Sequence, residues 1–415
     1  MQPLAIFLLA VSTFAGTLCA ESTSAPVEFD KARQIMERMR TGGPVTDEEK
    51  AYLDRAKAER GKTQPGAMSA DRIDWQKAQK LFRRDQRGEE LTADEQAYLA
   101  RAKKARQVVG DRQPPLAQRQ AHGPLKPLSD MGGEDTYEGE DGGLYGGGNN
   151  TPPAALVESA TAALRQIKPI AGSVVLVSIS MSNATMEFAT FKRMADADAR
   201  KSDKLTIIDC AQGGQAMAEW VDPEGAPWLE AMRRIERAGV TPAQVQVAWI
   251  KLANKNPGGS MKDHLGKLEA DTTAVLHNAK SRFPNLRIAY LGSRIWAGNA
   301  KGGLNPEPYA YESAFGVRHL IQRQLKGEPA LASDKAPLLL WGPYLWAAGT
   351  DGRKYDALKW EPQDFAGDGV HPSVTGREKV ARQLLEFYAG NRASSRHARS
   401  VRPPPVMASA PHAGP

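Results

Sequence analysis

The feature that most restricts the fold is an alternation of apolar runs and helical patterns between residues 154 and 391. Five runs rich in apolar residues are Val174–Ile179, Leu205–Ile208, Val245–Leu252, Ile288–Leu291 and Leu338–Trp341. Continuous apolar runs of this length indicate strands buried on both faces. Because they alternate with helical patterns, they favour a parallel sheet connected by right-handed crossovers. The sequence therefore predicts a three-layer α/β/α domain around a five-stranded parallel sheet.

The segments between these runs have helix-favouring sequences. The predicted helices lie near Ala184–Arg200, Trp228–Ala238, Met261–Ser281 and Tyr309–Leu325, with a last amphipathic helix over Val374–Tyr388. Together with the strands they assign residues 154–391 to one α/β domain.

A repeat of 46 residues precedes this domain. It pairs Ala32 with Ala78, Gly42 with Gly88, Thr46 with Thr92 and Tyr52 with Tyr98. Each copy has a helix, a glycine-containing turn and a second helix that starts with capping-box spacing, Thr46 with Glu49 and Thr92 with Glu95. Residues 27–107 are therefore predicted to form two helical hairpins, a small all-α region. Large apolar residues are few, so two interpretations stay open: a charged spacer, or a module that docks an unknown protein.

Residues 1–20 have no charged side chain and contain a short apolar run from Leu4 to Val11. This pattern predicts a signal peptide cleaved after Ala20, and hence a secreted or periplasmic protein. Leu18 is bulky where lipid-attachment signals prefer small residues, which argues against a lipid anchor at Cys19. No later run reaches the ~20 apolar residues that cross a bilayer, so no transmembrane segment is predicted. Cleavage would leave Cys210 as the single cysteine, which excludes an internal disulfide.

Two further segments lack helical or strand patterns. Residues 108–153 are rich in Gly, Pro and acidic side chains and are predicted to be a linker. Residues 392–415 are rich in Arg, Ser and Pro and are predicted to be a disordered tail. The net charge of +7 includes four tail arginines, which leaves +3 for the rest of the chain. That charge is too dilute to argue for nucleic-acid binding.

Polar and glycine residues follow the predicted strands, where an open parallel sheet binds its ligands. They are Ser180–Asn183 after the first strand, Asp209–Gly214 after the second, Asn254 and Asn256 after the third, Ser293–Arg294 after the fourth and Gly342–Trp346 after the fifth. The sequence Asp368-Gly-Val-His371-Pro precedes the last helix.

This arrangement resembles the SGNH (GDSL-like) hydrolase family over about residues 174–388. The resemblance implies Ser182 as nucleophile, His371 as base and Asp368 as the carboxylate that orients the imidazole, since a serine hydroxyl needs a base to become nucleophilic. It also implies oxyanion donors from the Ser182 and Gly214 backbone and the Asn254 side chain, and no cofactor. The family's Gly-Asp-Ser block is here Ser180-Met181-Ser182. Ser180 therefore stays open as a rival nucleophile, as do Gly213 and Asn256 as alternative oxyanion residues.

The segment from Ser293 to Glu312 and the residues after the fifth strand mix aromatic and hydrogen-bonding side chains. Arg294, Tyr309, Glu312 and Tyr344 are the candidate substrate-binding residues. Aromatic faces beside polar groups suit sugars, which makes a carbohydrate ester a candidate substrate. The other histidines of the domain form no H-x-H or H-E-x-x-H pattern, so no metal site is predicted.

The leading hypothesis is a secreted serine esterase or deacylase that hydrolyses a small ester, with an acetylated glycan as candidate, through an acyl-enzyme. One alternative is a non-catalytic envelope binding protein on an SGNH-like or flavodoxin-like fold. A flavodoxin-like binder would also have a Ser/Thr-rich first loop, as Ser178–Thr185 is, but it gives no reason for Asp-x-x-His at the far end of the domain.

Overall fold

The computed structural model describes residues 125–390 without a break, together with 44–62, 91–110, residue 119 and scattered positions between 31 and 84. The predicted signal peptide, with Cys19, and the predicted tail at 392–415 lie outside the described residues. The chain divides into two compact units, one ending at Ala102 and the other starting at Lys103. Each is described by itself.

The N-terminal unit shows the 46-residue repeat in its contacts. The second helices of the two copies are α2 (Asp47–Lys62) and α4 (Ala93–Gly110). In each copy the predicted capping box is formed, by Thr46 with Glu49 and by Thr92 with Glu95. Arg38 pairs with Glu49, and Arg84 pairs with Glu95 at 2.5 Å. Among the residues described in each copy, a few apolar side chains are buried together, including Leu53 in the first copy and Leu99 in the second.

The second unit is built on a parallel sheet with the strand order β4-β3-β5-β6-β7. The strands are β3 (Val174–Ser180), β4 (Leu205–Asp209), β5 (Val245–Lys251), β6 (Ile288–Leu291) and β7 (Leu338–Trp341). All neighbouring strands pair in parallel. Every residue of β3 and β5 is buried, as expected for strands covered on both faces. The predicted fold class is confirmed, and each observed strand differs from its predicted bounds by at most one residue.

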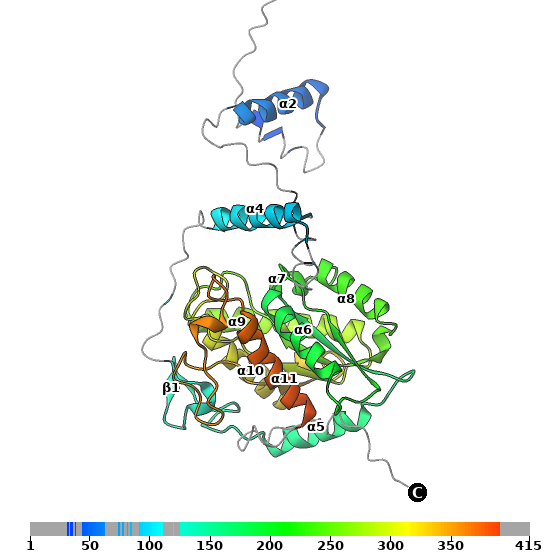
Figure 1. Cartoon of the computed structure of the whole chain (residues 1–415), viewed down its shortest axis with the longest axis vertical. Helices are drawn as coiled ribbons and strands as arrows, with labels where there is room; N and C mark the ends of the chain where they lie inside the picture. Colours follow the sequence, from blue (N-terminus) through cyan, green and yellow to red (C-terminus); the bar gives the residue numbers. More distant parts are fainter. Residues whose placement is uncertain are drawn as a thin grey trace, which may run out of the picture. The chain divides into compact units, whose positions relative to one another are not determined.

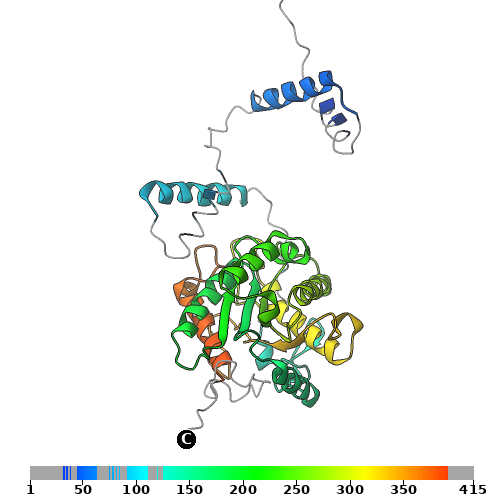
Figure 2. The same ribbon diagram turned by 90° about the vertical axis from the view of Figure 1, so that its right-hand side faces the viewer.

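Helices cover both faces of this sheet (Figures 1 and 2). Right-handed crossovers place α6 on one face, because β4 lies on one side of β3 and the later strands lie on the other. There α6 packs against α11, while α9 and α10 pack together on the opposite face. The helices are α5 (Ala154–Gln166), α6 (Ser182–Asp196), α7 (Met217–Val221), α8 (Ala226–Arg237), α9 (Met261–Arg282), α10 (Tyr309–Leu325) and α11 (Val374–Ala389). Short 3-10 turns are η1 (Leu128–Asp130), η2 (Pro242–Gln244), η3 (Pro329–Leu331) and η4 (Pro362–Asp364).

The structure differs from the predicted linker over residues 125–150, called the strap below. The strap contains a two-stranded antiparallel pair, β1 (Thr136–Tyr137) with β2 (Glu140–Asp141). Leu128, Met131 and Tyr137 belong to the main hydrophobic core. The buried guanidinium of Arg318 donates to the Asp141 carboxylate at 2.8 Å and to Glu140 at 2.6 Å. This part of the Gly-rich segment is therefore an integral layer of the α/β unit.

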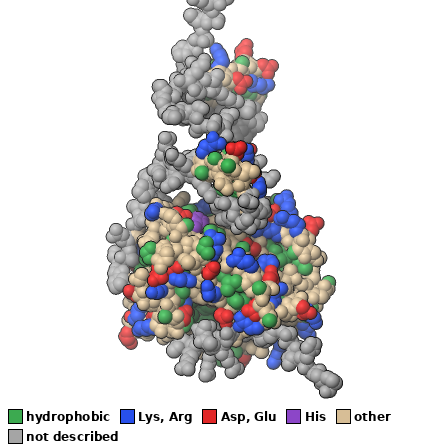
Figure 3. Space-filling view, viewed as in Figure 1, with side chains coloured by type: hydrophobic (Ala, Val, Ile, Leu, Met, Phe, Trp, Pro, Cys, Tyr) green, Lys and Arg blue, Asp and Glu red, His purple; other side chains and the backbone are tan. Residues whose placement is uncertain are grey.

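The exterior of the α/β unit carries charged side chains of both signs, which intermingle on the face shown in Figure 3. Within the described residues, no helix combines the length and the apolar character required to span a bilayer.

Candidate active site

Ser182 is placed at the carboxyl edge of the sheet by the end of β3. The strand ends at Ser180, Met181 is extended at the N-cap position without a side-chain cap, and Ser182 is the first residue of α6. The strand order changes direction around β3, with β4 on one side and β5 on the other. Such a switch point opens a crevice beyond the strand ends, where ligands bind in open α/β sheets. Ser182 therefore begins a helix at the position where this fold class binds its ligands.

Three side chains predicted to act together lie in one hydrogen-bonded chain. Ser182 Oγ lies 2.7 Å from His371 Nε2. His371 Nδ1 lies 2.5 Å from Asp368 Oδ2. A carboxylate only accepts, so Nδ1 carries a proton and, in the neutral ring, Nε2 faces the serine as an acceptor. The His371 side chain is 25% exposed, which leaves the group reachable from solvent.

The loop before α11 holds Asp368 in place. Asp368 Oδ1 accepts from the backbone N–H groups of Val370 and His371, each at 3.0 Å. Gly369 has φ +72°, and a Cβ there would meet Asn299 O at 1.8 Å. Only glycine fits this position, which explains the glycine in Asp-Gly-Val-His. Burial acts to raise the pKa of Asp368, but the His371 contact and the two N–H donors outweigh it and hold the pKa well below its ordinary value. The carboxyl is therefore ionised across neutral pH.

Gly214 follows β4 as Ser182 follows β3, so both residues come after strands that end at the same edge of the sheet. Gln212 N donates to Ser180 O at 3.0 Å, so Ser182 and Gly214 each stand two residues beyond a bonded pair. Gly214 has φ +80°, a conformation that favours glycine, whereas Gly213 is not among the residues with positive φ. The N–H of Ser182 is at the start of a helix and has no acceptor within that helix. The backbone N–H groups of Ser182 and Gly214 are therefore the two candidate donors at this edge of the sheet.

Asn254 lies on the neighbouring loop, but part of its amide is already used. Its Nδ2 donates to Asp271 Oδ2 at 2.5 Å, and one of the two amide hydrogens stays available for another acceptor. The Lys255 ammonium donates to Gly214 O at 3.0 Å, which brings the loops after β4 and β5 together. Asn256 instead turns away into a backbone bond with Gly303 O at 3.0 Å and has φ +48°. Met217 N donates to Ala253 O at 3.2 Å, so the residue before Asn254 contacts the segment that follows Gly214, which supports Asn254 as the candidate donor.

Ser180, the rival nucleophile, is fully buried and donates its hydroxyl to the Lys251 carbonyl. Its Oγ therefore has no access to a substrate and lies on the strand itself. The contacts favour Ser182 as the reactive serine.

The structure does not support the four predicted substrate-binding residues, because their side chains are all buried. These residues are Arg294, Tyr309, Glu312 and Tyr344. Arg294 interacts with the buried carboxylates of Glu187 and Glu307, and burial lowers its pKa to about 10. The ring of Tyr309 packs edge-on against His264. Glu312 accepts a hydrogen bond from Tyr137 Oη at 3.0 Å. The Oη of Tyr344 accepts one from Leu128 N at 2.9 Å. Glu312 and Tyr344 tie the strap to the core. Packing, rather than substrate contact, explains this mixture of aromatic and polar residues.

The segment between β6 and α10 nevertheless reaches the site through its backbone. Lys301 N donates to Asp368 O at 3.0 Å, and Gly303 O accepts from Asn256 N. Residues 299–304 therefore run from the loop of His371 to the loop of Asn254. Lys301 and Leu304 are exposed members of this segment.

Two polar clusters near the site were missed in the sequence. The first joins Asp209, at the end of β4, to Ser178 and Thr185. Burial raises the pKa of Asp209 to about 6, against hydrogen bonds and the charge of Arg234 that lower it. The second is the ion pair between Lys251 and Glu187, both completely buried. Each cluster joins residues that are distant in the sequence. The sequence pattern that could have indicated them is the presence of polar residues inside apolar strands.

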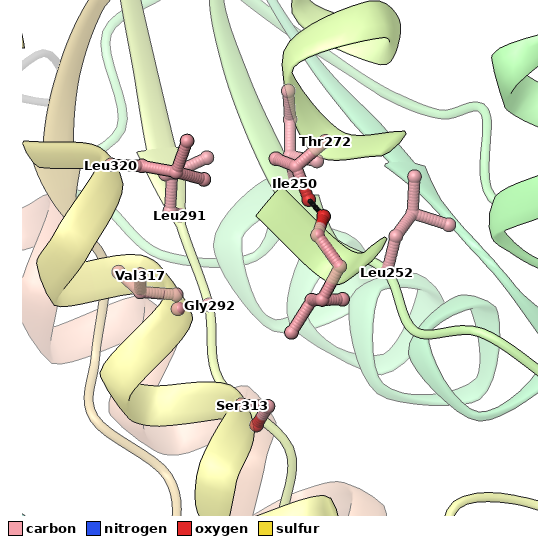
Figure 4. Close-up of a pocket in the computed structure, with 10 residues that line it drawn as sticks. Ile250, Leu252, Thr272, Leu291, Gly292, Ser313, Val317 and Leu320 are labelled. Carbon is pink, nitrogen blue, oxygen red and sulfur yellow. Dashed lines mark hydrogen bonds between the residues drawn. The ribbon is translucent and has the colours of Figure 1, made fainter. Parts of the chain in front are cut away.

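A small apolar cavity lies elsewhere, between the ends of β5 and β6 and the helices α9 and α10 (Figure 4). Leu252, Leu291, Val317 and Leu320 line it, and its volume of about 20 Å³ holds roughly one water molecule. None of Ser182, Gly214, Asn254, Asp368 and His371 lines this cavity. Among the described residues, no group of three or more His, Cys, Asp or Glu side chains is arranged to hold a metal ion.

No family model matches the chain, and no curated protein matches it in sequence. Solved structures match at low similarity. A GDSL-like lipase from Bacteroides thetaiotaomicron has 12% identity over 57% of this chain and 97% of its own, with a TM-score of 0.32. A protein from Arabidopsis thaliana has 13% identity over 50% of this chain and 68% of its own, at 0.31. The periplasmic domain of a lipopolysaccharide acetyltransferase from Salmonella ser. Paratyphi A has 16% identity over 58% of this chain and 91% of its own, at 0.29.

These scores are too low to transfer any activity, so the chemistry must come from the site itself. The chain resembles a divergent SGNH (GDSL-like) hydrolase over residues 174–388 in two respects. One is the order of its strands in the sheet. The other is the order in which the candidate residues follow the strands: Ser182, Gly214, Asn254, and Asp368 with His371.

Proposed function

We propose that the protein is a serine esterase or deacylase that hydrolyses a small acyl ester through an acyl-enzyme on Ser182. The observation that carries the proposal is the chain of two hydrogen bonds from Ser182 through His371 to Asp368, at 2.7 and 2.5 Å. Nucleophile, base and orienting carboxylate in this order are the parts that acyl transfer requires.

In the proposed mechanism, Ser182 Oγ attacks the carbonyl carbon of the ester while its proton moves to His371 Nε2. The tetrahedral intermediate collapses, the bond to the alcohol oxygen breaks, and the imidazolium returns that proton to the leaving alcohol. Water then attacks the acyl carbon and gives a proton to His371 Nε2. The bond to Ser182 Oγ breaks, the imidazolium returns that proton to Oγ, and the carboxylic acid is released. Asp368 stays ionised and stabilises the imidazolium in both halves.

The oxyanion of each intermediate would be held by the Ser182 and Gly214 N–H groups and by the Asn254 amide. Supporting this, Ser182 N is at the positive end of α6, where backbone N–H groups and the helix dipole favour negative charge. Removal of one such donor in comparable sites costs about 10²–10³ in turnover.

The substrate is proposed only as a small ester. The aromatic and charged residues that suggested a carbohydrate are buried, so an acetylated glycan stays a prediction to be screened. Secretion or a periplasmic location follows from the predicted signal peptide alone, and protein docking by the helical repeats stays a prediction as well.

The test is hydrolysis of p-nitrophenyl acetate by the full chain, compared with Ser182→Ala, His371→Ala and Ser180→Ala. We expect the first two variants to lose at least about 10³ in kcat/KM. The Ser180→Ala chain is the matched control, because it removes a hydroxyl two residues away that is buried against the Lys251 carbonyl. It should keep kcat within a few-fold.

A fluorophosphonate probe supplies the second readout, since it labels activated serines without needing the correct acyl group. Labelling of the wild type and Ser180→Ala but not Ser182→Ala supports the proposal. A wild type that neither hydrolyses the ester nor reacts with the probe would refute it and favour the non-catalytic binding protein.

A further inference from the structure

The carboxylate of Asp209 connects the helix that carries Ser182 to the turn that follows β4. Thr185, in the first turn of α6, donates its hydroxyl to Asp209 Oδ2. Asp209 Oδ1 accepts from Ser178 Oγ at 2.5 Å and from Ala211 N at 3.1 Å. One side chain thus receives donors from β3, from α6 and from its own turn.

The same turn is fixed from two other sides. Ser178 Oγ accepts from Cys210 N at 3.0 Å and Ala211 N at 3.1 Å. The guanidinium of Arg234, on α8, donates to Asp209 O at 2.8 Å and Ala211 O at 3.0 Å. The turn that leads to Gly214 is therefore tied to β3 and α8 through its backbone, and to α6 through the Asp209 carboxylate and the hydroxyl of Thr185.

Thr185 stands three residues after Ser182, so the two lie on the same side of the first helical turn. A hydrogen bond that pulls Thr185 toward β4 also fixes the rotation and height of Ser182. The residue before the nucleophile is Met181, whose side chain has no hydrogen-bond donor able to do this.

From these contacts we infer that Asp209 is a positioning residue, which acts through Thr185 to set Ser182 against both His371 and the backbone donor of Gly214. The predicted effect on turnover rests on the proposed function. The hydrogen-bonded link between α6 and the turn after β4 can be measured independently of any activity. Asp209 touches neither substrate nor reacting atoms, so its effect should fall on turnover and not on substrate binding.

The test starts from Thr185, because removal of the Asp209 carboxylate would also take away the acceptor of the buried Ser178 hydroxyl and could unfold the turn. Thr185→Val keeps the shape and deletes the donor, and Thr185→Ser restores the donor. Thr190→Val is the matched control: Thr190 is on the same helix, is buried, and donates to Met186 O at 2.9 Å within that helix.

We expect Thr185→Val to lower kcat for p-nitrophenyl acetate by about tenfold, with KM within about twofold, since displacement of a reacting group by even an ångström is costly. Thr185→Ser should recover most of the rate, and Thr190→Val should keep it. Amide hydrogen exchange supplies the independent readout. Thr185→Val should speed exchange at residues 182–186 and 210–214 together, whereas Thr190→Val should leave 210–214 unchanged.

An active wild type with unchanged kcat in Thr185→Val overturns the inference, as does a rate that Thr185→Ser fails to recover. If the wild type shows no hydrolysis, the exchange experiment decides. Joint acceleration of both segments supports the link and leaves only the proposed function refuted, while unchanged exchange at 210–214 overturns the link itself.

Discussion

The imidazole of His371 lies 2.7 Å from Ser182 Oγ although 189 residues separate the two in the chain. Ser182 follows the first strand of the sheet, and His371 follows the last. The contact therefore depends on the whole domain: each crossover between β3 and α11 must be right-handed, and each strand must occupy its position in the sheet. The packing of α6 against α11 on one face brings the start of each helix to the same edge.

Replacing Asp368 by asparagine tests the orientation of the base. A carboxamide at this position can donate as well as accept, so the imidazole can turn its Nε2–H toward Ser182 and cease to act as a base. We expect kcat for p-nitrophenyl acetate to fall by about 10²–10⁴ with little change in KM. Asp351→Asn, an exposed loop position, is the control for loss of a surface carboxylate. Equal kcat in Asp368→Asn and wild type would contradict the proposed triad.

Gly214→Ala separates backbone strain from catalysis. Gly214 has φ +80° and Gly239 has φ +72°, and a Cβ at either position meets no atom within 4 Å. Both alanine variants should therefore lose a similar stability, about 1–2 kcal/mol from the left-handed conformation, measured by urea unfolding. Only Gly214→Ala should also lower kcat, by about tenfold or more, because the strained backbone turns its N–H away from the crevice. An equal kcat in the two variants would rule out a role for Gly214 as an oxyanion donor.

Much of the fold was predictable because its signals are local. The buried parallel strand Val174–Ser180 has the sequence VVLVSIS, with apolar residues at five of seven positions. The helix Val374–Ala389 buries residues three or four positions apart, such as Val380, Leu384 and Tyr388. The Asp-Gly-Val-His sequence was informative for the same reason: Asp368, Gly369 and His371 build their own loop, and the partner they need is the first polar turn after the first strand.

The burial of polar residues was not predictable, because it depends on which segment packs over them. The strap supplies partners of Glu312, Arg318 and Tyr344. Its glycine-rich sequence predicts a linker, and without the strap Glu312 and Tyr344 are interpreted as substrate-binding residues. Asp209 illustrates the same point at the site, since its acceptors are filled by donors from two other elements.

The strap makes a prediction about stability. Arg318 has a 2% exposed side chain and donates to carboxylates and carbonyls of the strap. Arg318→Ala removes these bonds and leaves a cavity, so we expect a loss of about 2–4 kcal/mol of unfolding free energy and faster proteolysis within residues 125–150. The exposed i,i+4 pair of Arg382 with Glu378 gives the control, because Arg382→Ala should change stability by less than about 1 kcal/mol. Equal stability in the two variants would show that the strap is not an integral layer.

His264 makes a prediction about acid stability. Its ring is buried, its Nδ1 donates to Glu312 at 2.8 Å, and Arg119 also pairs with Glu312. Burial, together with the charge of Arg119, lowers the pKa of His264 to about 4 from an ordinary value of 6.5. The unfolded chain therefore binds a proton between pH 6.5 and 4 that the folded chain does not, and stability falls as the pH is lowered through this window.

His264→Asn keeps an N–H donor for Glu312 and removes the titration. Wild type should lose up to about 3 kcal/mol more unfolding free energy than the variant between about pH 7 and pH 4, because protonation of the buried ring is opposed in the folded state alone. Urea unfolding of both chains at about pH 7, 6, 5 and 4 measures this difference, in which the other titrating groups largely cancel. Parallel stability curves over that range would mean that His264 is protonated as easily in the folded chain as in the unfolded one, and that Glu312 rather than Arg119 dominates its surroundings.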